Sequence, residues 1–260
     1  MNILFIGDVV GKVGRNEVIN RLSYLKNKYS IDFVIANLEN ATHGKGLSLG
    51  HYRTMTEAGI NCVTMGNHYY RVADVLTKNE EFVNMIRPGN IHTSTPGVGT
   101  KVFTVKDKTI RVTNLIGKVF IDMADTNPFD YLNNIIEKED KTDIHIVDFH
   151  AEATGEKMCL AKAFDGKLTA VLGTHTHVQT NDARILPLGT GFMSDVGMCG
   201  LYESILGVEP KEVINRTWKG IPGKFVTPES GRGQLNAAIL EIDDTTNKLT
   251  KISPLYLIDD

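Results

Sequence analysis

Short apolar runs alternate with amphipathic segments along the first third of the chain. The apolar runs have the length and composition of buried strands, and the segments between them place apolar residues three and four positions apart, as at Val18, Leu22 and Leu25. This alternation predicts an α/β fold. The expected elements are strands at residues 2–6, 33–36 and 62–65, and helices at residues 16–28, 48–58 and 73–85.

The second half of the chain is richer in strand-like segments. Residues 101–105 and 109–117 are joined through Lys106-Asp107-Lys108, which predicts a hairpin at a sheet edge. The Gly- and Pro-containing stretch 220–233 is expected to be a long loop. The other expected elements are a helix at 129–138, strands at 143–149, 170–172 and 191–196, and a C-terminal strand pair at 234–242 and 248–257.

The composition is that of a globular protein. With 260 residues, 42% of them hydrophobic and 23% charged, the chain can bury a core as one large domain or two tightly fused halves. It is neither disordered nor membrane-like by composition. The formal net charge of −3 provides no basic field, which argues against a duplex nucleic acid as partner.

The N-terminus and the cysteines indicate the cellular location to expect. Residues 1–6 form an apolar run that stops at Gly7-Asp8, without the basic flank or cleavage site of a signal peptide, so a first strand is expected here. Cys62, Cys159 and Cys199 are odd in number and form no C-x-x-C pair. This pattern predicts a reducing, cytoplasmic location and disfavours zinc held by thiolates.

Polar residues of metal-binding type follow five of the predicted strands. The carboxyl ends of strands in an α/β sheet share one edge, where ligands bind, so these segments are expected to converge. Each residue alone has an ordinary alternative, such as a helix cap or a turn, but their joint occurrence favours a site. They are Asp8, Glu39-Asn40, Asn67-His68, His150, and the pair His175 and His177 of a His-x-His motif.

The chemistry of these donors narrows the function. Carboxylate, carboxamide and imidazole groups without thiolates suit manganese, iron or zinc, and the sequence does not choose among them. The whole set predicts a dinuclear metal centre. Two ions that share a bridging oxygen ligand clamp a phosphoryl group and lower the pKa of the water between them, so phosphoester hydrolysis is the favoured reaction.

The motifs resemble those of the calcineurin-like metallophosphoesterases, and in particular the YmdB-type bacterial subfamily. The wider superfamily has a histidine soon after the first aspartate and a G-D-x-x-D second motif. Here Asp8 is followed by Val9-Val10-Gly11, and the second motif is Asn37-Leu38-Glu39-Asn40. The resemblance spans essentially the whole chain. The segments that match the subfamily closely are 7–15, 148–154, 173–180 and 195–198.

This resemblance implies a four-layer α-β-β-α sandwich and a single metallophosphoesterase domain over residues 1–260. It implies two divalent or trivalent metal ions, with iron or manganese expected first and magnesium or zinc as alternatives. Glu39 resembles the bridging carboxylate. The coordination of one ion is then completed by Asp8, Asn40 and His177, with Asn40 in place of the missing histidine. The coordination of the other ion is completed by Asn67, His150 and His175.

His68 is the candidate catalytic residue. Next to a ligand but not needed as one, it is expected to protonate the leaving alkoxide or to stabilise charge on the phosphoryl oxygens. Its alternative role is to orient Asn67. The subfamily continues with Thr-Trp-Asp after this histidine, whereas this chain has Tyr69-Tyr70-Arg71 and so lacks a carboxylate that could orient His68. The two tyrosines either stack a base or are plain packing.

The predicted function is a dinuclear metal-dependent phosphodiesterase for small cyclic nucleotides, of the 2′,3′-cyclic or 3′,5′-cyclic type, acting through attack of metal-bound hydroxide. The alternatives are a broader phosphomonoesterase or phosphoprotein phosphatase, and a regulatory module that binds a nucleotide or RNA with weak turnover. The expected partners are a small phosphodiester substrate and, as a possibility, further copies of the chain, with no membrane and no duplex nucleic acid.

Overall fold

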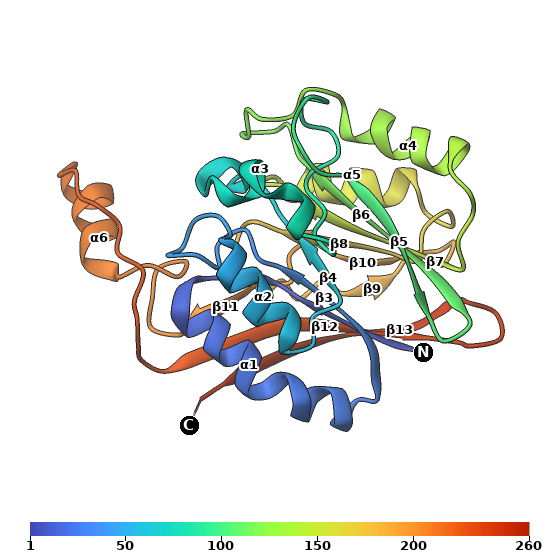
Figure 1. Ribbon diagram of the computed structural model, residues 1–260, viewed down its shortest axis with the longest axis horizontal. Coiled ribbons are helices and arrows are strands. Elements are labelled where there is room, and N and C mark those ends of the chain that lie inside the picture. The colour runs from blue at the N-terminus through green and yellow to red at the C-terminus, as the bar shows by residue number, and fades with distance from the viewer. Residues whose placement is uncertain (260) are drawn as a thin grey trace.

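The computed structural model describes residues 1–259 and contains two β-sheets (Figure 1). The first sheet has the strand order β2-β11-β12-β1-β3-β4, and β13 pairs with β12. Its parallel centre, β1 to β3 to β4, follows from the strand–helix alternation predicted for the start of the chain. The strands are β1 (Asn2–Ile6), β2 (Asp8–Val9), β3 (Ile31–Asn37), β4 (Cys62–Thr64), β11 (Met198–Leu201), β12 (Gly233–Ile242) and β13 (Leu249–Ile258).

The second sheet has the order β5-β6-β7-β8-β10-β9. The predicted hairpin is confirmed as the antiparallel pair β5 and β6, with β5 at the edge. From β6 to β10 the strands are parallel, so their carboxyl ends again share one edge. The strands are β5 (Thr100–Val105), β6 (Lys108–Ile116), β7 (Ile144–His150), β8 (Ala170–Thr174), β9 (Arg184–Ile185) and β10 (Gly191–Met193).

Alternation of side chains along the strands produces the layers. In β1, Ile3 and Phe5 belong to a core shared with β6, β7 and β8 of the second sheet, whereas Leu4 and Ile6 pack with the helices on the other face. A separate core lies between the second sheet and its own helices. Because successive strand residues point to opposite faces, both sheets bury both faces, and the result is the predicted four-layer α-β-β-α sandwich.

The outer layers consist of helices on the two far faces (Figure 1). Helices α1 and α2 supply Leu22 and Tyr52 to the core outside the first sheet, and α4 and α5 supply Leu132 and Leu160 to the core outside the second. Helices α5 and α6 were not predicted from the sequence. The helices are α1 (Gly11–Lys28), α2 (Leu49–Glu57), α3 (Asp74–Thr77), α4 (Pro128–Lys138), α5 (Thr154–Ala163) and α6 (Pro210–Lys219).

The prediction of one helix over residues 73–85 is wrong. Only the short α3 and the 3-10 turn η2 (Asn79–Glu81) form there, separated by the non-helical backbone of Lys78. The Asn79 side-chain amide donates to the Val75 carbonyl oxygen (3.0 Å) and to the Tyr69 hydroxyl (3.1 Å). In a continuing helix the Val75 carbonyl oxygen would accept from the Asn79 backbone N–H, but here it accepts from the Asn79 side chain. Because the same side chain also contacts Tyr69 outside the segment, tertiary contacts override the local helix propensity.

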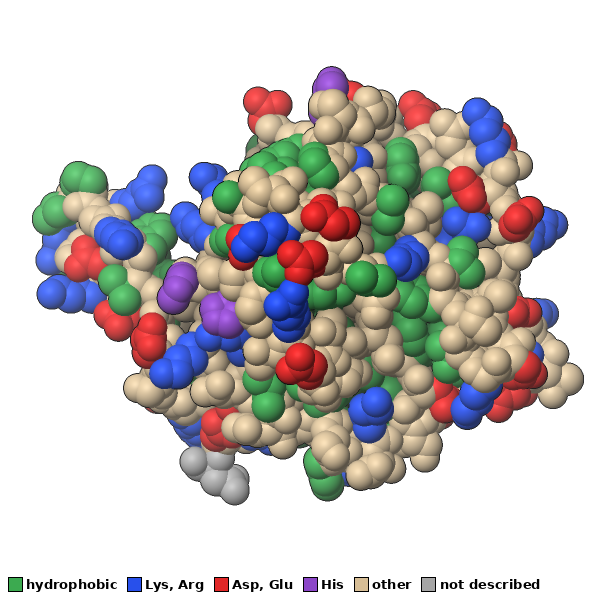
Figure 2. All heavy atoms as spheres, viewed as in Figure 1, with side chains coloured by type: hydrophobic (Ala, Val, Ile, Leu, Met, Phe, Trp, Pro, Cys, Tyr) green, Lys and Arg blue, Asp and Glu red, His purple; other side chains and the backbone are tan. Residues whose placement is uncertain are grey.

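Helix α6 projects away from the two sheets at one end of the molecule, and Figure 2 shows hydrophobic and basic side chains together on this projection. None of its side chains is buried. The predicted long loop is confirmed between α6 and β12. Among the described residues, no helix combines the length and the apolar character that crossing a membrane requires.

Candidate metal centre

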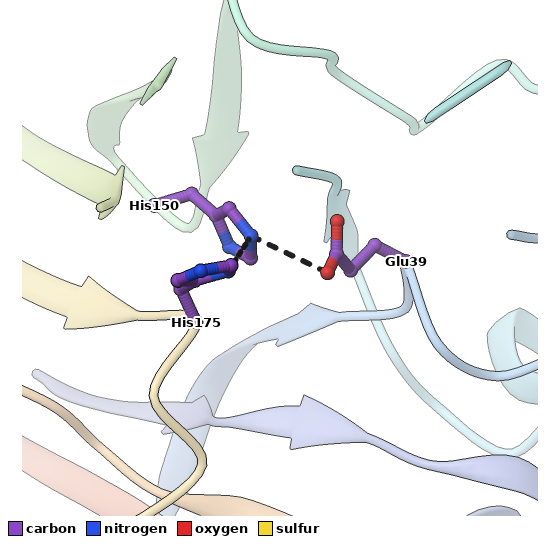
Figure 3. A group of neighbouring side chains, drawn as sticks. All are labelled: Glu39, His150 and His175. Atoms are coloured by element: carbon purple, nitrogen blue, oxygen red, sulfur yellow. Dashed lines mark hydrogen bonds and ion pairs between the residues drawn. The ribbon is translucent and has the colours of Figure 1, made fainter. Parts of the chain in front are cut away.

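The polar residues that follow the parallel strands meet at one place, where the carboxyl edges of the two sheets face each other. Asp8, Glu39-Asn40 and Asn67-His68 follow β1, β3 and β4 of the first sheet. The second sheet supplies His150 at the end of β7, and His175 and His177 just after β8. Figure 3 shows Glu39, His150 and His175 pointing toward one another from three different segments. The predicted convergence is therefore present.

The centre of this cluster is the Nε2 atom of His150. It lies 2.9 Å from the Asn67 Oδ1 atom, 3.0 Å from the His175 Nδ1 atom and 3.3 Å from the Glu39 Oε1 atom. One ligand atom each from Glu39, His150 and His175 lies within 4.8 Å of the other two. The His150 and Glu39 side chains are buried away from bulk water, whereas the His175 side chain is 21% exposed and so lies at the open side of the cluster.

Each of the three histidines is fixed by an acceptor on its outer side. The His150 Nδ1 atom lies 2.9 Å from the Thr174 hydroxyl, which donates to Asp148 (2.7 Å). The His175 Nε2 atom lies 3.1 Å from the Glu152 carboxylate, and the His177 Nδ1 atom lies 3.0 Å from the Leu206 carbonyl oxygen. An imidazole that donates from its outer nitrogen presents a lone pair at the other, which is how proteins prepare histidines as metal ligands.

Asp8 provides a direct test of whether the residues fit a metal ion. Its Oδ2 atom accepts from the His175 backbone N–H (3.1 Å), but its Oδ1 atom is buried and has no hydrogen-bond partner among the described residues. Burial raises the pKa of Asp8 above its ordinary value. An unpartnered buried carboxylate oxygen is costly, and a cation beside it removes that cost. The donor set therefore fits a metal ion.

The charges of the other two groups are consistent with this reading. Burial alone would raise the pKa of Glu39, but the imidazoles of His150 and His68 outweigh it and hold the pKa well below its usual range. Burial disfavours the charged form of His150, yet the carboxylates of Glu39 and Asp8 outweigh it and raise its pKa to about 9. The surroundings of His150 thus favour a positive charge, which a metal ion also supplies.

His68 and Asn40 form a contact that the sequence did not reveal. The His68 Nδ1 atom lies 2.6 Å from the Asn40 Oδ1 atom and 3.3 Å from the Glu39 Oε1 atom, so these two residues orient the ring in place of the missing carboxylate. Asn40 turns its amide nitrogen inward, toward Glu39 (3.1 Å) and the His177 Nε2 atom (3.2 Å). Oxygen ligation by Asn40 therefore requires its amide to turn over.

The backbone around the site is strained. His175 and His177 have φ angles of 100° and 66°, in the left-handed region that residues other than glycine rarely adopt. The Asp195 carboxylate accepts from the Thr176 backbone N–H (3.0 Å) and hydroxyl (2.8 Å) between them, and it pairs with the buried Lys157 ammonium at 2.8 Å. Such strain persists where surrounding contacts hold it and is typical of functional sites.

Sequence reasoning assigned no role to several residues that support the cluster. A signal exists for Asp148, a carboxylate inside the apolar strand β7, and for Lys157, a lysine that the spacing of α5 turns inward. Both are fully buried, which neither residue type tolerates without partners. Thr174, Glu152 and Leu206 carry no comparable signal, because a threonine, a surface glutamate and a backbone carbonyl occur in every chain.

Comparisons with known proteins identify chains that are similar over their whole length. The family model for YmdB-like proteins matches residues 4–255. A Bacillus subtilis protein named 2′,3′-cyclic-nucleotide 2′-phosphodiesterase is 42% identical, covering 100% of this chain and 98% of its own. A solved structure described as a novel phosphatase from Mycoplasma pneumoniae superposes with a TM-score of 0.93 at 43% identity, over 100% of this chain and 94% of that one.

More distant structures share the fold alone. A 5′-nucleotidase structure from Staphylococcus aureus has a TM-score of 0.63 at 18% identity and covers 100% of this chain and 55% of that one. This likeness extends to the arrangement of two sheets and their helices.

Proposed function

This chain belongs to the YmdB-like protein family, and from that premise we propose that it is a metal-dependent phosphodiesterase that hydrolyses small cyclic nucleotides. The first substrates to consider are 2′,3′-cyclic nucleoside monophosphates, because a relative 42% identical over its whole length carries that name. Hydrolysis of 3′,5′-cyclic nucleotides belongs to the same proposal. The name of the Mycoplasma pneumoniae relative keeps a phosphatase acting on monoesters as the second candidate.

One observation supports the proposal: each of the three histidines has a polar partner at its outer ring nitrogen, as histidines that bind metals do. Thr174, Glu152 and the Leu206 carbonyl each occupy the outer nitrogen of one imidazole. The opposite nitrogens and the unpartnered Asp8 oxygen then surround the same space as Glu39 and Asn67. On this inner side the His150 Nε2 and His175 Nδ1 atoms lie 3.0 Å apart and the Asp8 Oδ1 atom has no hydrogen-bond partner among the described residues, and a metal ion would satisfy all three atoms at once.

The proposed ligand sets are those that the family resemblance implies, and the grouping of Glu39, His150 and His175 supports them. Glu39 lies between the groups supplied by the two sheets and is proposed to bridge two ions. The coordination of one ion would be completed by Asp8, Asn40 and His177, and that of the other by Asn67, His150 and His175. When bound, such ions polarise a phosphoryl oxygen and make a water-derived nucleophile available near neutral pH. Iron or manganese is proposed first from the donor types, with magnesium or zinc as alternatives.

His68 is proposed to protonate the oxygen that leaves phosphorus when the ester bond breaks. Its Nδ1 atom faces the Asn40 Oδ1 atom, so in the neutral ring the proton resides on Nδ1. If Asn40 held an ion through its oxygen, its amide nitrogen would face His68 instead, and Nδ1 would become an acceptor. The neutral ring would then carry its proton on Nε2, from which it could be donated to the leaving oxygen. Ligation by Asn40 and the proton on His68 are coupled in this way.

The His68→Ala variant tests this role. We expect it to keep its metal content, measured by elemental analysis, while kcat for 2′,3′-cyclic AMP falls by about a hundredfold, within the usual contribution of general acid catalysis. His92→Ala is the matched control, because His92 is exposed and contacts Ser94. An unchanged kcat in His68→Ala would leave His68 with the orienting role alone, and lost metal would make it a structural support of the ligands.

The decisive experiment for the function is a grid of metals against substrates. The protein is stripped of metal, reloaded with Mn²⁺, Fe²⁺, Zn²⁺ or Mg²⁺, and assayed with 2′,3′-cyclic AMP, 3′,5′-cyclic AMP, a generic phosphodiester and a phosphomonoester. We expect cyclic nucleotides to be the preferred substrates of at least one metal form. Preference for the monoester would favour the phosphatase, and saturable nucleotide binding without turnover would favour a regulatory module.

Two broader assignments belong to the same proposal. A small phosphodiester is the proposed partner, since the relatives' names point to diester chemistry and the net charge of −3 does not favour a duplex nucleic acid. The scattered cysteines support a cytoplasmic location. Cell fractionation with an antibody to the protein tests that location.

A further inference from the structure

A pocket of about 570 Å³ opens beside the metal centre and shares Asn67 and His175 with it. The remaining wall comes from two loops at the carboxyl ends of different sheets. Tyr70 and Arg71 lie in the 3-10 turn η1 (Tyr69–Arg71) after β4, and Phe120 and Met123 lie in the segment between β6 and α4. We call this the flanking pocket. The flanking pocket therefore adjoins the position proposed for the phosphate.

The flanking pocket presents aromatic rings to solvent. Phe120 is 88% exposed and Tyr70 is 44% exposed, whereas the neighbouring Tyr69 is completely buried. The structure thus assigns different positions to the two tyrosines, which the sequence could not tell apart. Tyr69 packs in the core, and Tyr70 lines the pocket. Exposed aromatic side chains beside a phosphate-binding site are the usual means of holding a nucleobase, because every base has a flat face on which a ring can stack.

The Tyr70 ring is held in place before any ligand arrives, and the backbone at Phe120 is strained. The Tyr70 hydroxyl lies 2.8 Å from the Thr95 hydroxyl, and its ring packs edge-on against Tyr69 with centroids 5.5 Å apart. Phe120 has a φ angle of 65°, a conformation that is strained for a bulky residue. Because the Phe120 ring is exposed, packing of that ring does not explain the strained backbone. Strain of this kind is concentrated at sites that hold ligands.

Arg71 adds a polar group to this aromatic wall. Among the described residues, its guanidinium has no ion pair and no hydrogen bond, although Asp122 also lines the pocket. Mostly apolar walls with a few unpaired polar groups are characteristic of small-molecule sites. A guanidinium can donate to the ring nitrogen and carbonyl acceptors on the edge of a base.

We propose that the flanking pocket binds the base of the nucleotide substrate, with the base stacked on Phe120 and Tyr70 and its edge contacted by Arg71. This proposal rests on the proposed function and specifies its substrate as a nucleotide recognised through its base. It also assigns Tyr70 and Arg71 of the turn η1 a part in recognising substrate.

The test uses the metal-loaded Phe120→Ala and Tyr70→Ala variants with 2′,3′-cyclic AMP. We expect KM to rise by about tenfold in each variant, as loss of one stacking ring implies, while kcat changes far less. Inhibition by inorganic phosphate should stay as in the unmodified protein, because phosphate reaches the metal centre alone. Leu188→Ala is the matched control, since Leu188 is 73% exposed but lines a separate pocket with Leu186 and Lys248.

Direct binding of AMP, measured by titration calorimetry, separates this proposal from the proposed function. If the unmodified protein binds AMP without hydrolysing any cyclic nucleotide and Phe120→Ala weakens that binding, the function fails and the pocket assignment stands. If turnover is normal and neither variant changes KM, the pocket assignment is overturned and the function stands. An equal loss of phosphate inhibition would overturn it too, because it would show a general distortion of the site.

Discussion

Gly66 lies against two of the proposed ligands, and its lack of a side chain is a steric requirement. A Cβ atom built on it would collide with the His150 Nε2 atom and the Glu39 Oε2 atom, both of which point into the centre. Neither neighbour can withdraw, because Glu39 also accepts from the His68 backbone N–H (2.9 Å) and His150 is fully buried. At the scale of single residues, the ligand positions therefore depend on a residue that binds nothing.

The Gly66→Ala variant should lose most of its bound metal by elemental analysis and, with it, its phosphodiesterase activity. The physical reason is that the added methyl group collides with two of the proposed ligands, His150 and Glu39, and displaces them. Gly155→Ala is the matched control, since Gly155 lies in α5 and a Cβ atom there meets nothing within 4 Å. We expect the control to bind metal normally and to gain about 0.5 kcal/mol in unfolding free energy. Full metal occupancy in Gly66→Ala would contradict the assigned ligand geometry.

At the scale of elements, helix α5 holds the loop that carries His175 and His177. Lys157 of α5 reaches Asp195, and Asp195 accepts from Thr176 between the two histidines. Both members of the ion pair are essentially inaccessible to water, so each charge depends on the other. The pair therefore couples the packing of a helix to the position of two proposed ligands.

Removal of one charge from this pair should be costly. We expect Lys157→Met to lower the unfolding free energy by about 3 kcal/mol, because it leaves Asp195 as a buried carboxylate without its counter-ion. Urea titration measures the loss. The matched control is Lys251→Met, which breaks an exposed pair with Glu241 at 3.0 Å and should cost less than about 1 kcal/mol. Equal effects in the two variants would show that the buried pair is not a support of the loop.

The proposed centre also joins the two sheets at the scale of the whole molecule. Glu39 and Asp8 come from the first sheet and His150 and His175 from the second, and the core beneath them contains Phe5 of β1 and Ile146 of β7. We therefore propose that residues 1–260 form a single domain that unfolds as one unit. A metal ion that binds only the assembled pair of sheets stabilises that unit by mass action.

Metal removal should lower the melting temperature accordingly. At a free metal concentration a hundred times Kd, binding adds about 2.7 kcal/mol of stability, which corresponds to a shift of roughly 5 to 10 °C for a chain of this size. Differential scanning calorimetry with and without a chelator measures it. Glu39→Ala should show no metal-dependent shift, because it lacks the proposed bridging carboxylate. Two separate transitions in the unmodified protein would contradict the single domain.

What the sequence alone determined was local. The positions of most strands and of α1, α2 and α4 followed from the spacing of apolar residues, whereas α5 and α6 were missed. The candidate ligands were found because polar residues ended five of the predicted strands. The ends of parallel strands meet at one edge in any α/β sheet, so convergence could be expected without coordinates. The failed helix at residues 73–85 marks the limit of this reasoning, because Asn79 there bonds to Tyr69 outside the segment.

Only the tertiary structure decided which atoms of those residues face one another. The acceptors that fix His150, His175 and His177 come from Thr174, Glu152 and Leu206, and nothing in their types marks them in advance. Tyr69 and Tyr70 are adjacent in sequence and opposite in exposure for the same reason. Periodicity reports which face of an element is buried, whereas the direction of a polar side chain depends on neighbours brought together by packing across two sheets.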